Sequence, residues 1–395
     1  MVDVAQLSGL SREHEDFRRM VREFAEAEIA PHVAGWDAAH HFPVDVVRRM
    51  GDLGLFGLTA PEHLGGSGGD FTSLCLAIEE LGRVDQSIGI TLEAAVGLGI
   101  NPILTYGTPE QQERWLPDLV AGRRLAGFGL TEPGAGSDAG ATRTRARQDD
   151  ATGEWVVDGA KQFITNSGSE LTSLVTVTAR TGTRENGSAE ISCITVPAGT
   201  EGFEVGPAYD KLGWNISDTH PLTFTDVRVP EDHLLGARGR GYAQFLATLD
   251  DGRIAIAALA VGCIQACLDL CVQYAGERTT FGQPIGAKQG VAFQIADLAT
   301  MAEVSRAITY RAAAMKDAGV TGAPLKHAAS IAKLHTSEAA VSATRIATQV
   351  FGGYGFMEEY PVARFYRDAK ILEIGEGTSE VQRILIARGL GLPVE

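Results

Sequence analysis

The sequence predicts an α+β protein, mostly α, in which an antiparallel β domain lies between two helical domains. Two observations carry this prediction. Apolar residues recur at three-and-four spacing early and late in the chain, and the middle is rich in Gly and Thr with period-two alternation. Helices, then strands, then helices do not form the alternating pattern of a parallel α/β sheet. We expect an N-terminal helical domain over 1–124, a β domain over 125–235 and a C-terminal four-helix bundle over 236–395.

The N-terminal domain opens with an amphipathic helix that Pro31 is expected to end. The apolar face of this helix consists of Phe17, Met20, Val21, Phe24 and Ala25. Helical patterns recur over 71–82, 87–106 and 109–119.

Strands are predicted in the middle of the chain from alternating apolar residues over 174–177, 191–196 and 222–229. Turn residues separate these strands, including Asp158 with Gly159 and Asn186 with Gly187. From about Gly241 the helical periodicity returns over 241–275, 284–317, 325–350 and 377–389, which predicts a bundle of four helices.

The composition is that of an ordinary globular protein, since 44% of the 395 residues are hydrophobic and 21% are charged. A net charge of -16 argues against a protein that coats nucleic acid or an anionic membrane, because both need a basic surface. No apolar run approaches the length of a membrane span, and Asp3, Glu13 and Glu15 replace the basic and apolar start of a signal segment. We therefore expect a cytoplasmic protein with no stable membrane insertion.

Cys263, Cys267 and Cys271 recur every four residues and would share one face of a helix. Three thiols on one face are compatible with a metal site. The surrounding residues are apolar, however, and neither His nor a CxxC spacing is present, so we expect packing of small residues and no metal.

The segment 129–140 carries four glycines and a proline beside Thr131 and Ser137. Such a loop exposes backbone amides that can take a pyrophosphate or the edge of a flavin ring. A dinucleotide-binding loop must open a helix, whereas a strand is expected to follow here. By itself the segment is also compatible with a tight turn, but Phe163 and Thr165 follow at a strand end, where they suit a planar ring.

Both segments resemble the flavin-binding motifs of the acyl-CoA dehydrogenase family. Residues 278–282, 349–355 and 366–383 resemble the C-terminal motifs of that family in the same order and at comparable spacing, so the resemblance covers essentially the whole chain. It implies an FAD enzyme that converts an acyl-CoA thioester to a trans-2-enoyl-CoA and passes electrons to electron transfer flavoprotein.

The resemblance also assigns FAD contacts, position by position. Those within the β domain are Phe128, Leu130, Thr131, Gly136 and Ser137, with Phe163 and Thr165 against the isoalloxazine. The position of Phe163 is often Trp in relatives, so stacking is kept here and an indole donor is lost.

A second group of residues resembles positions through which a neighbouring subunit holds the far end of FAD, which implies a homotetramer built as a dimer of dimers. These residues are Arg278, Phe281, Gln289, Gln349 and Gly353, while Thr378, Ser379 and Glu380 would contact FAD from the subunit's own last helix. A surface arginine in a turn is the alternative interpretation of Arg278.

Glu376 resembles the general base that removes the α-proton, and a helix N-cap is the alternative for a lone carboxylate before a helix. A dry flavin pocket would raise the pKa of this carboxyl group toward the range of an effective base. The resemblance also implies that the backbone amide of the base stabilises the enolate oxygen.

Substrate contacts are implied for Ser137, Asp250, Arg253 and Gly377. Residues 250–253, at the head of a helix, could otherwise be a helix cap. Some relatives carry the base on this helix, but Gly252 and Glu376 match the commoner arrangement.

The acyl pocket of the family is bounded by the segment 89–99 and by the residue before the base. Both look roomy, because Ala94, Ala95, Gly97 and Gly99 are small and Gly375 replaces a bulky Tyr, although small residues can equally be close helix contacts. We expect acyl chains of medium length or longer, or branched chains, to be favoured over butyryl-CoA. The alternative functions are a flavin oxidase or monooxygenase on the same scaffold and a catalytically inactive scaffold homologue.

Overall fold

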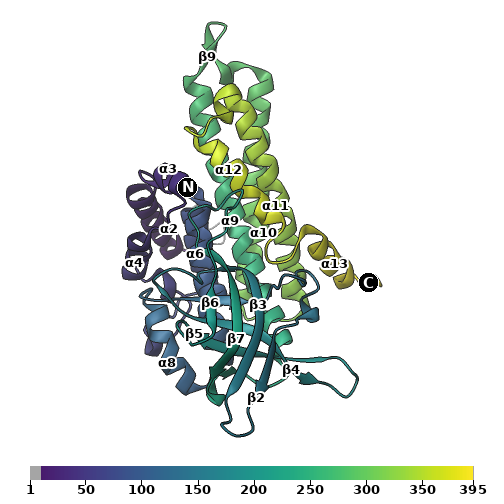
Figure 1. The fold of residues 1–395 in the computed structure, drawn as a ribbon. Coiled ribbons are helices and arrows are strands. Elements are labelled where there is room, and N and C mark those ends of the chain that lie inside the picture. Colours follow the sequence, from purple (N-terminus) through teal and green to yellow (C-terminus); the bar gives the residue numbers. More distant parts are fainter. Residues whose placement is uncertain (1–9, 395) are drawn as a thin grey trace.

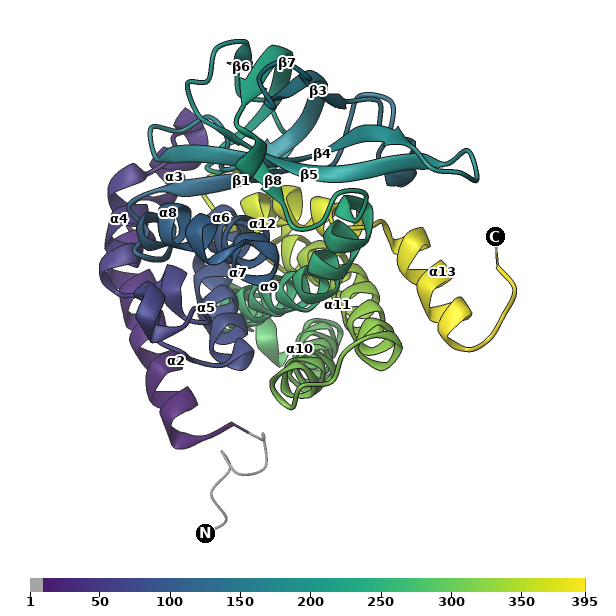
Figure 2. The ribbon, with the colours of Figure 1, turned by 90° about the horizontal axis from the view of Figure 1, so that it is seen from below.

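The computed structural model describes residues 10–394 and confirms the predicted fold class, in which helices precede and follow a β domain (Figure 1). Asp3 lies outside the described residues. Figure 2 shows the sheet lying across one side of a helical body. The tip of the C-terminal helices points away from the sheet (Figure 1).

The N-terminal helices follow the predicted apolar periodicity. They are α2 (Arg12–Phe24), α3 (Val33–Ala39), α4 (Val44–Asp52), α5 (Phe71–Val84), α6 (Gln86–Glu93), α7 (Asn101–Tyr106) and α8 (Pro109–Val120). A π-helical turn (Ala25–Ile29) extends α2, and the chain leaves the helix before Pro31, as predicted. A second π-helical turn (Ala94–Ile100) joins α6 to α7, so the predicted 87–106 helix is continuous but widened in its middle.

The β domain consists of β1 (Leu125–Gly129), β2 (Arg145–Gln148), β3 (Trp155–Thr165), β4 (Thr172–Thr183), β5 (Ala189–Pro197), β6 (Phe203–Val205), β7 (Thr219–Val229) and β8 (Leu234–Leu235). The strand order is β6-β7-β3-β2-β4-β5-β8, and β1 pairs with β4. The prediction of a purely antiparallel sheet is wrong, because β1 and β2 both run parallel to β4. Alternation identifies a strand but not its direction, which the β2–β3 crossover between β1 and β4 determines here.

The C-terminal helices are α9 (Gly241–Glu277), α10 (Gln289–Asp317), α11 (Ala323–Phe351), α12 (Pro361–Ala369) and α13 (Ser379–Gly389). A short hairpin, β9 (Thr279–Thr280) with β10 (Gln283–Pro284), forms the tip of the bundle (Figure 1). The helix predicted from 284 therefore begins only at Gln289, because this hairpin and a 3-10 turn (Ile285–Ala287) come first. The cysteine prediction is confirmed, since Cys263, Cys267 and Cys271 are fully buried in the core.

Two segments are long and apolar enough to cross a bilayer by length and composition, Gln86–Tyr106 and Gly241–Glu277. The most apolar window of each is 72% and 78% buried inside the fold, respectively. Such burial is typical of the core helices of a globular protein.

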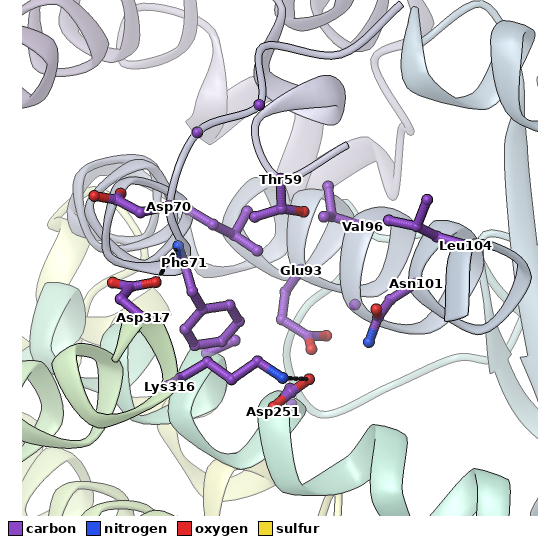
Figure 3. A pocket seen from close by; sticks show the side chains of 16 residues that line it. Thr59, Asp70, Phe71, Glu93, Val96, Asn101, Leu104, Asp251, Lys316 and Asp317 are labelled. Atoms are coloured by element: carbon purple, nitrogen blue, oxygen red, sulfur yellow. Dashed lines mark hydrogen bonds and ion pairs between the residues drawn. The ribbon is translucent and has the colours of Figure 1, made fainter. Parts of the chain in front are cut away.

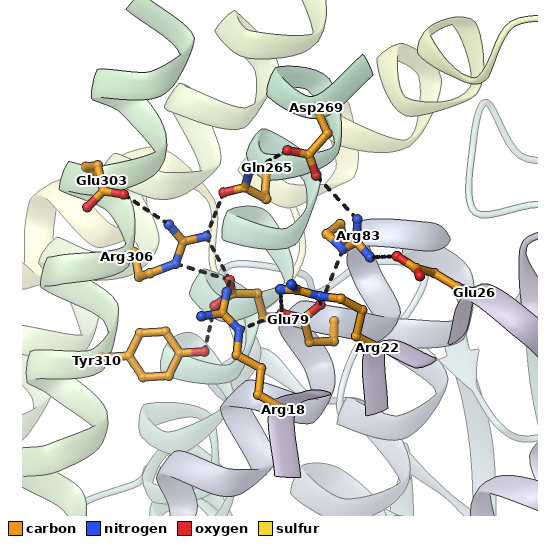
Figure 4. Close-up of polar contacts among 11 residues, drawn as sticks. Arg18, Arg22, Glu26, Glu79, Arg83, Gln265, Asp269, Glu303, Arg306 and Tyr310 are labelled. Atoms are coloured by element: carbon orange, nitrogen blue, oxygen red, sulfur yellow. Dashed lines mark hydrogen bonds and ion pairs between the residues drawn. The ribbon is translucent and has the colours of Figure 1, made fainter. Parts of the chain in front are cut away.

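A buried ion network joins three helices of the two helical domains (Figure 4). Glu79 and Glu80 lie on α5 with almost no exposure. Arg18 of α2 donates to both carboxylates, at 2.9 and 2.6 Å, and Arg306 of α10 donates to Glu79 at 2.9 Å. Since a buried carboxylate needs charged partners, the network fixes α2 and α10 against α5.

Candidate active site

Glu376 lies in the short segment between α12 and α13, in the left-handed backbone region with φ of 52°. Polar side chains from two helices hold this segment. Nζ of Lys333 on α11 donates to the carbonyl of Gly377 at 2.8 Å, and Nε2 of Gln382 donates to the same carbonyl at 3.0 Å. The N-cap of α13 is Thr378, whose hydroxyl accepts from the amide of Val381, so Glu376 is not the cap.

The carboxyl group of Glu376 points into the protein. Its Oε2 atom is buried and receives no hydrogen bond from any donor that the structure describes. A β-carbon at Gly252 of α9 would clash with this oxygen, so the glycine makes room for the carboxylate. Burial raises the pKa of Glu376 to about 6, while a hydrogen bond with Glu93 and the charges of Lys333 and Arg253 lower it.

Glu93 is a second carboxyl group beside Glu376, and the sequence analysis missed it. It ends α6, is fully buried, and neither of its oxygens has a donor among the described residues. Burial raises the pKa of Glu93 well above its usual range, and the neighbouring Glu376 raises it further. The signal in the sequence was one acidic residue in the otherwise uncharged stretch 86–100.

A cavity of about 430 Å³ opens beside this pair of carboxyl groups (Figure 3). Its wall includes Glu93, Val96, Gly97, Gly252 and Ala255. At its edge Lys316 of α10 forms an ion pair with Asp251 of α9 at 2.9 Å.

Only part of the segment predicted to bound the acyl pocket lines this cavity. Gly97 does, but Ala94, Ala95 and Gly99 do not. A β-carbon at Gly99 would lie 2.9 Å from the carbonyl oxygen of Ala126, so this glycine is a close helix-to-strand contact. A β-carbon at Gly375 would meet nothing closer than 3.5 Å, so the position before Glu376 has free space.

Asp250 and Arg253 lie in the interior of α9 rather than at a helix head, so the cap interpretation of this segment is wrong. The head of the helix is ten residues earlier because the apolar pattern continues back to Gly241. The two side chains form an ion pair with each other, and Nε of Arg253 is buried without a partner. Gly252, between Asp250 and Arg253, brings this pair next to Glu376.

The glycine-rich loop connects β1 to β2, with only a 3-10 turn (Ala139–Ala141) between them, so it does not open a helix, as expected. Phe128 of β1 stacks on Phe245 of α9 with ring centroids 3.6 Å apart. Gly136 and Ser137 are exposed, and a β-carbon at Gly136 would meet no atom within 4 Å. The loop thus has the open space and free surface that a flavin cofactor requires.

A buried ion pair, which the sequence analysis also missed, anchors both ends of this loop. Nζ of Lys161 contacts the carboxylate of Glu132 at 2.8 Å and the carbonyl of Leu130 at 3.1 Å. The Glu132 carboxylate in turn accepts from the amides of Arg143 and Thr144. Burial lowers the pKa of Lys161 to about 8, although the Glu132 charge opposes that shift.

Phe163 and Thr165 lie at the end of β3, as predicted. Phe163 has a φ of 62° and its side chain is 62% exposed, which is unusual for an aromatic ring in a strand. Its only aromatic neighbour among the described residues is Tyr209, with ring centroids 5.2 Å apart. The exposed face of the ring is available for stacking on a planar ligand.

Thr378, Ser379 and Glu380 begin α13, directly after the Glu376 segment. Ser379 is buried, and its hydroxyl has no hydrogen-bond partner among the described residues. A buried hydroxyl without a partner fits a ligand that supplies one. Leu130 and Thr131 are half-buried at the foot of the glycine loop, and the Thr131 carbonyl accepts from the amide of Gln162 at 2.9 Å.

The remaining FAD candidates gather at the far tip of the helical bundle (Figure 1). Arg278 lies 5.4 Å above the ring of Tyr354. Phe281 is 95% exposed, and the others, Gln289, Gln349 and Gly353, are also exposed. About 25 residues of helix separate Arg278 from Arg253, which corresponds to roughly 38 Å along the axis. The structure thus divides the predicted FAD residues into two distant groups.

Three family models match successive parts of the chain. They describe the N-terminal, middle and C-terminal domains of acyl-CoA dehydrogenases, over residues 11–123, 127–227 and 239–391 respectively.

Individual relatives are similar along almost the whole chain. A probable acyl-CoA dehydrogenase of Bacillus subtilis, YngJ, is 47% identical over 96% of this chain and 98% of its own length. The mitochondrial short-chain specific acyl-CoA dehydrogenase of Bos taurus is 42% identical over 97% of this chain and 91% of its own. The solved structure of butyryl-CoA dehydrogenase from Megasphaera elsdenii is 40% identical with a TM-score of 0.92, and the match covers 96% of this chain and 98% of that one. The chain therefore belongs to the acyl-CoA dehydrogenase family of FAD-dependent oxidoreductases.

Proposed function

We propose that this enzyme dehydrogenates an acyl-CoA thioester to a trans-2-enoyl-CoA, with Glu376 as the base that removes the α-proton. The observation that carries the proposal is the carboxylate of Glu376, buried between two helices beside a cavity and without a donor on Oε2. A base in such a site is weakly solvated and has a raised pKa, which suits proton abstraction from carbon near neutral pH.

The residues around Glu376 have complementary roles. The Lys333 and Gln382 contacts keep the backbone of Glu376 and Gly377 in its left-handed conformation and so aim the carboxylate. The backbone amide of Glu376 would donate to the thioester oxygen and stabilise the enolate that forms. Arg253 adds positive charge near the same point.

FAD would lie along the glycine loop, with Phe163 and Thr165 at the ring and Ser379 as a further contact. The open surface at Gly136 and the unpartnered hydroxyl of Ser379 support this assignment. When bound, FAD would accept the hydride from the β-carbon of the substrate.

The test is the Glu376→Gln variant of the holoenzyme. We expect it to retain flavin and to lose acyl-CoA-dependent bleaching by at least about 100-fold, because the amide keeps the shape of the side chain but cannot accept the proton. In the wild type, bleaching needs the carboxylate, so its rate should fall as the pH drops through about 6. Stopped-flow absorbance under anaerobic conditions measures both effects.

A Glu373→Gln variant is a matched control, because Glu373 lies three residues away and its carboxylate pairs with Lys370. It should bleach at the wild-type rate. Near-normal flavin reduction by Glu376→Gln would show that Glu376 is not the base.

The family resemblance supports electron transfer flavoprotein as the electron acceptor. A flavin oxidase or monooxygenase would instead consume oxygen in steady state, and an inactive scaffold would not bleach at all. Oxygen uptake measured beside the reduction of added electron transfer flavoprotein distinguishes these three functions.

A further inference from the structure

We propose that Glu93 keeps a proton on its carboxyl group and donates it in a hydrogen bond to Glu376, so that the base stays ionised and correctly aimed. This inference rests on the proposed role of Glu376. It makes Glu93 a positioning residue that acts through the base.

The geometry leaves few other partners for Glu93. Its side chain is fully buried at the end of α6, and no donor among the described residues reaches either oxygen. Oε2 of Glu376 is also buried without such a donor, and the two carboxyl groups interact directly. Two ionised carboxylates in contact would repel, whereas one shared proton turns the contact into an O–H···O⁻ hydrogen bond.

The charges around the pair indicate which of the two carries the proton. Lys333 of α11 and Arg253 of α9 both favour the ionised form of Glu376. Neither cation is a main influence on Glu93, whose pKa is raised by burial and by the negative charge of Glu376.

The other charged groups nearby are largely neutralised. Asp250 pairs with Arg253, and Asp251 pairs with Lys316 at the edge of the cavity. Glu373 and Glu380 act on Lys333 from the far side. The proton is therefore best placed on Glu93.

The consequence for the reaction is a lower pKa of Glu376 than burial alone would give. The α-proton moves from carbon to the Glu376 carboxylate, and the proton on Glu93 stays where it is. Removing the donor at 93 should make Glu376 protonate at higher pH, which leaves less active base at neutrality.

The experiment compares Glu93→Gln and Glu93→Leu in the flavin-loaded enzyme. The amide of Gln still donates a hydrogen bond, whereas Leu fills similar space without a donor. For Glu93→Leu we expect the acid limb of the bleaching rate to move up by about one to two pH units, as expected for loss of a hydrogen bond to a charged group. For Glu93→Gln it should stay within about half a unit of the wild type, which is rescue by the conservative variant.

Infrared difference spectroscopy supplies a reading independent of turnover. At pH 8 the wild type and Glu376→Gln should show the carbonyl band of a buried protonated carboxyl group, and Glu93→Gln should lack it. A shift of the acid limb to lower pH in Glu93→Leu, or identical limbs in all three proteins, would overturn the inference, as would a missing band in the wild type.

Failure of the base assignment remains distinguishable from failure of this inference. If Glu376→Gln bleaches normally, the proposed function is wrong at its base, while the infrared band still reports the proton on Glu93. If Glu376→Gln is inactive but the Glu93 variants match the wild type, only the role of Glu93 fails.

Discussion

At the scale of single residues, the reaction site depends on positions where a side chain is missing. Gly252 leaves room for the Glu376 carboxylate, because any β-carbon there would clash with it. Gly97 lines the cavity, and a β-carbon there would lie 3.0 Å from Oε1 of Glu93. Gly375 has free space around it, so this position can change without breaking a packing contact.

Gly375→Tyr should shift the acyl-chain preference toward shorter chains. We propose that the wild type prefers chains of medium length or longer, or branched chains, and that a bulky ring beside the base would narrow this space. Each buried methylene contributes on the order of 0.8 kcal/mol, or about fourfold in kcat/KM. A panel of saturated acyl-CoAs from butyryl to palmitoyl, measured for both proteins, gives the two profiles.

Gly391→Tyr is not a suitable control, because its φ of 82° disfavours any side chain, whereas exposed Gly290 lies in open space within a helix. Gly290→Ala should leave the chain-length profile unchanged. A wild-type kcat/KM that is highest for butyryl-CoA and falls with each added carbon would contradict the proposed preference.

At the scale of elements, the glycine loop is held by a strand rather than by its own sequence. Lys161 stands on β3 and reaches across to Glu132 and to the carbonyl of Leu130, so the position of the loop depends on the sheet. The Glu132 carboxylate is held strongly ionised, with a pKa lowered to about 2, because the Lys161 charge outweighs the effect of burial.

Lys161→Met should destabilise the protein by about 3 to 5 kcal/mol, since it leaves the Glu132 carboxylate buried without its cation. Flavin should also dissociate more readily, because the loop loses its anchor. Urea unfolding and equilibrium dialysis of FAD measure the two effects separately. The double variant Lys161→Met with Glu132→Gln should recover much of the stability, because no buried charge remains unpaired.

Arg123→Met is the matched control, because Arg123 pairs with Asp118 on the surface at 2.8 Å. An exposed pair of this kind contributes at most about 1 kcal/mol. Equal losses in Lys161→Met and Arg123→Met would mean that the buried pair does not anchor the loop.

At the scale of the whole molecule, one chain cannot bring all the predicted FAD residues to one cofactor. The tip group around Arg278 lies far along α9 from the Glu376 region, and its apolar side chains are exposed, including Phe281 and Phe356 at 95% and 87%. Exposed aromatic rings in one place mark a surface that contacts another protein. We propose that the tip contacts a neighbouring subunit and completes its FAD site, in a tetramer built as a dimer of dimers.

Light scattering should therefore find a tetramer in the FAD-loaded protein. Arg278→Ala should weaken FAD retention by about tenfold or more with little change in unfolding, because Arg278 is exposed and makes no ion pair among the described residues. Arg19→Ala on the exposed face of α2 provides the control and should retain FAD normally. A fully FAD-loaded monomer would rule out a shared site.

The sequence by itself determined the helices, the strands, the family and the residues of the motifs, because apolar spacing and motif order are local properties of the chain. Thr378 rather than Glu376 as the cap, and the interior position of Asp250 in α9, needed the actual helix boundaries. Only the tertiary structure decided that β1 runs parallel to β4, that Lys161 holds Glu132, and that Glu93 meets Glu376. These contacts join parts of the chain that are distant in sequence, so they depend on how the elements pack and leave no periodic signal in either segment.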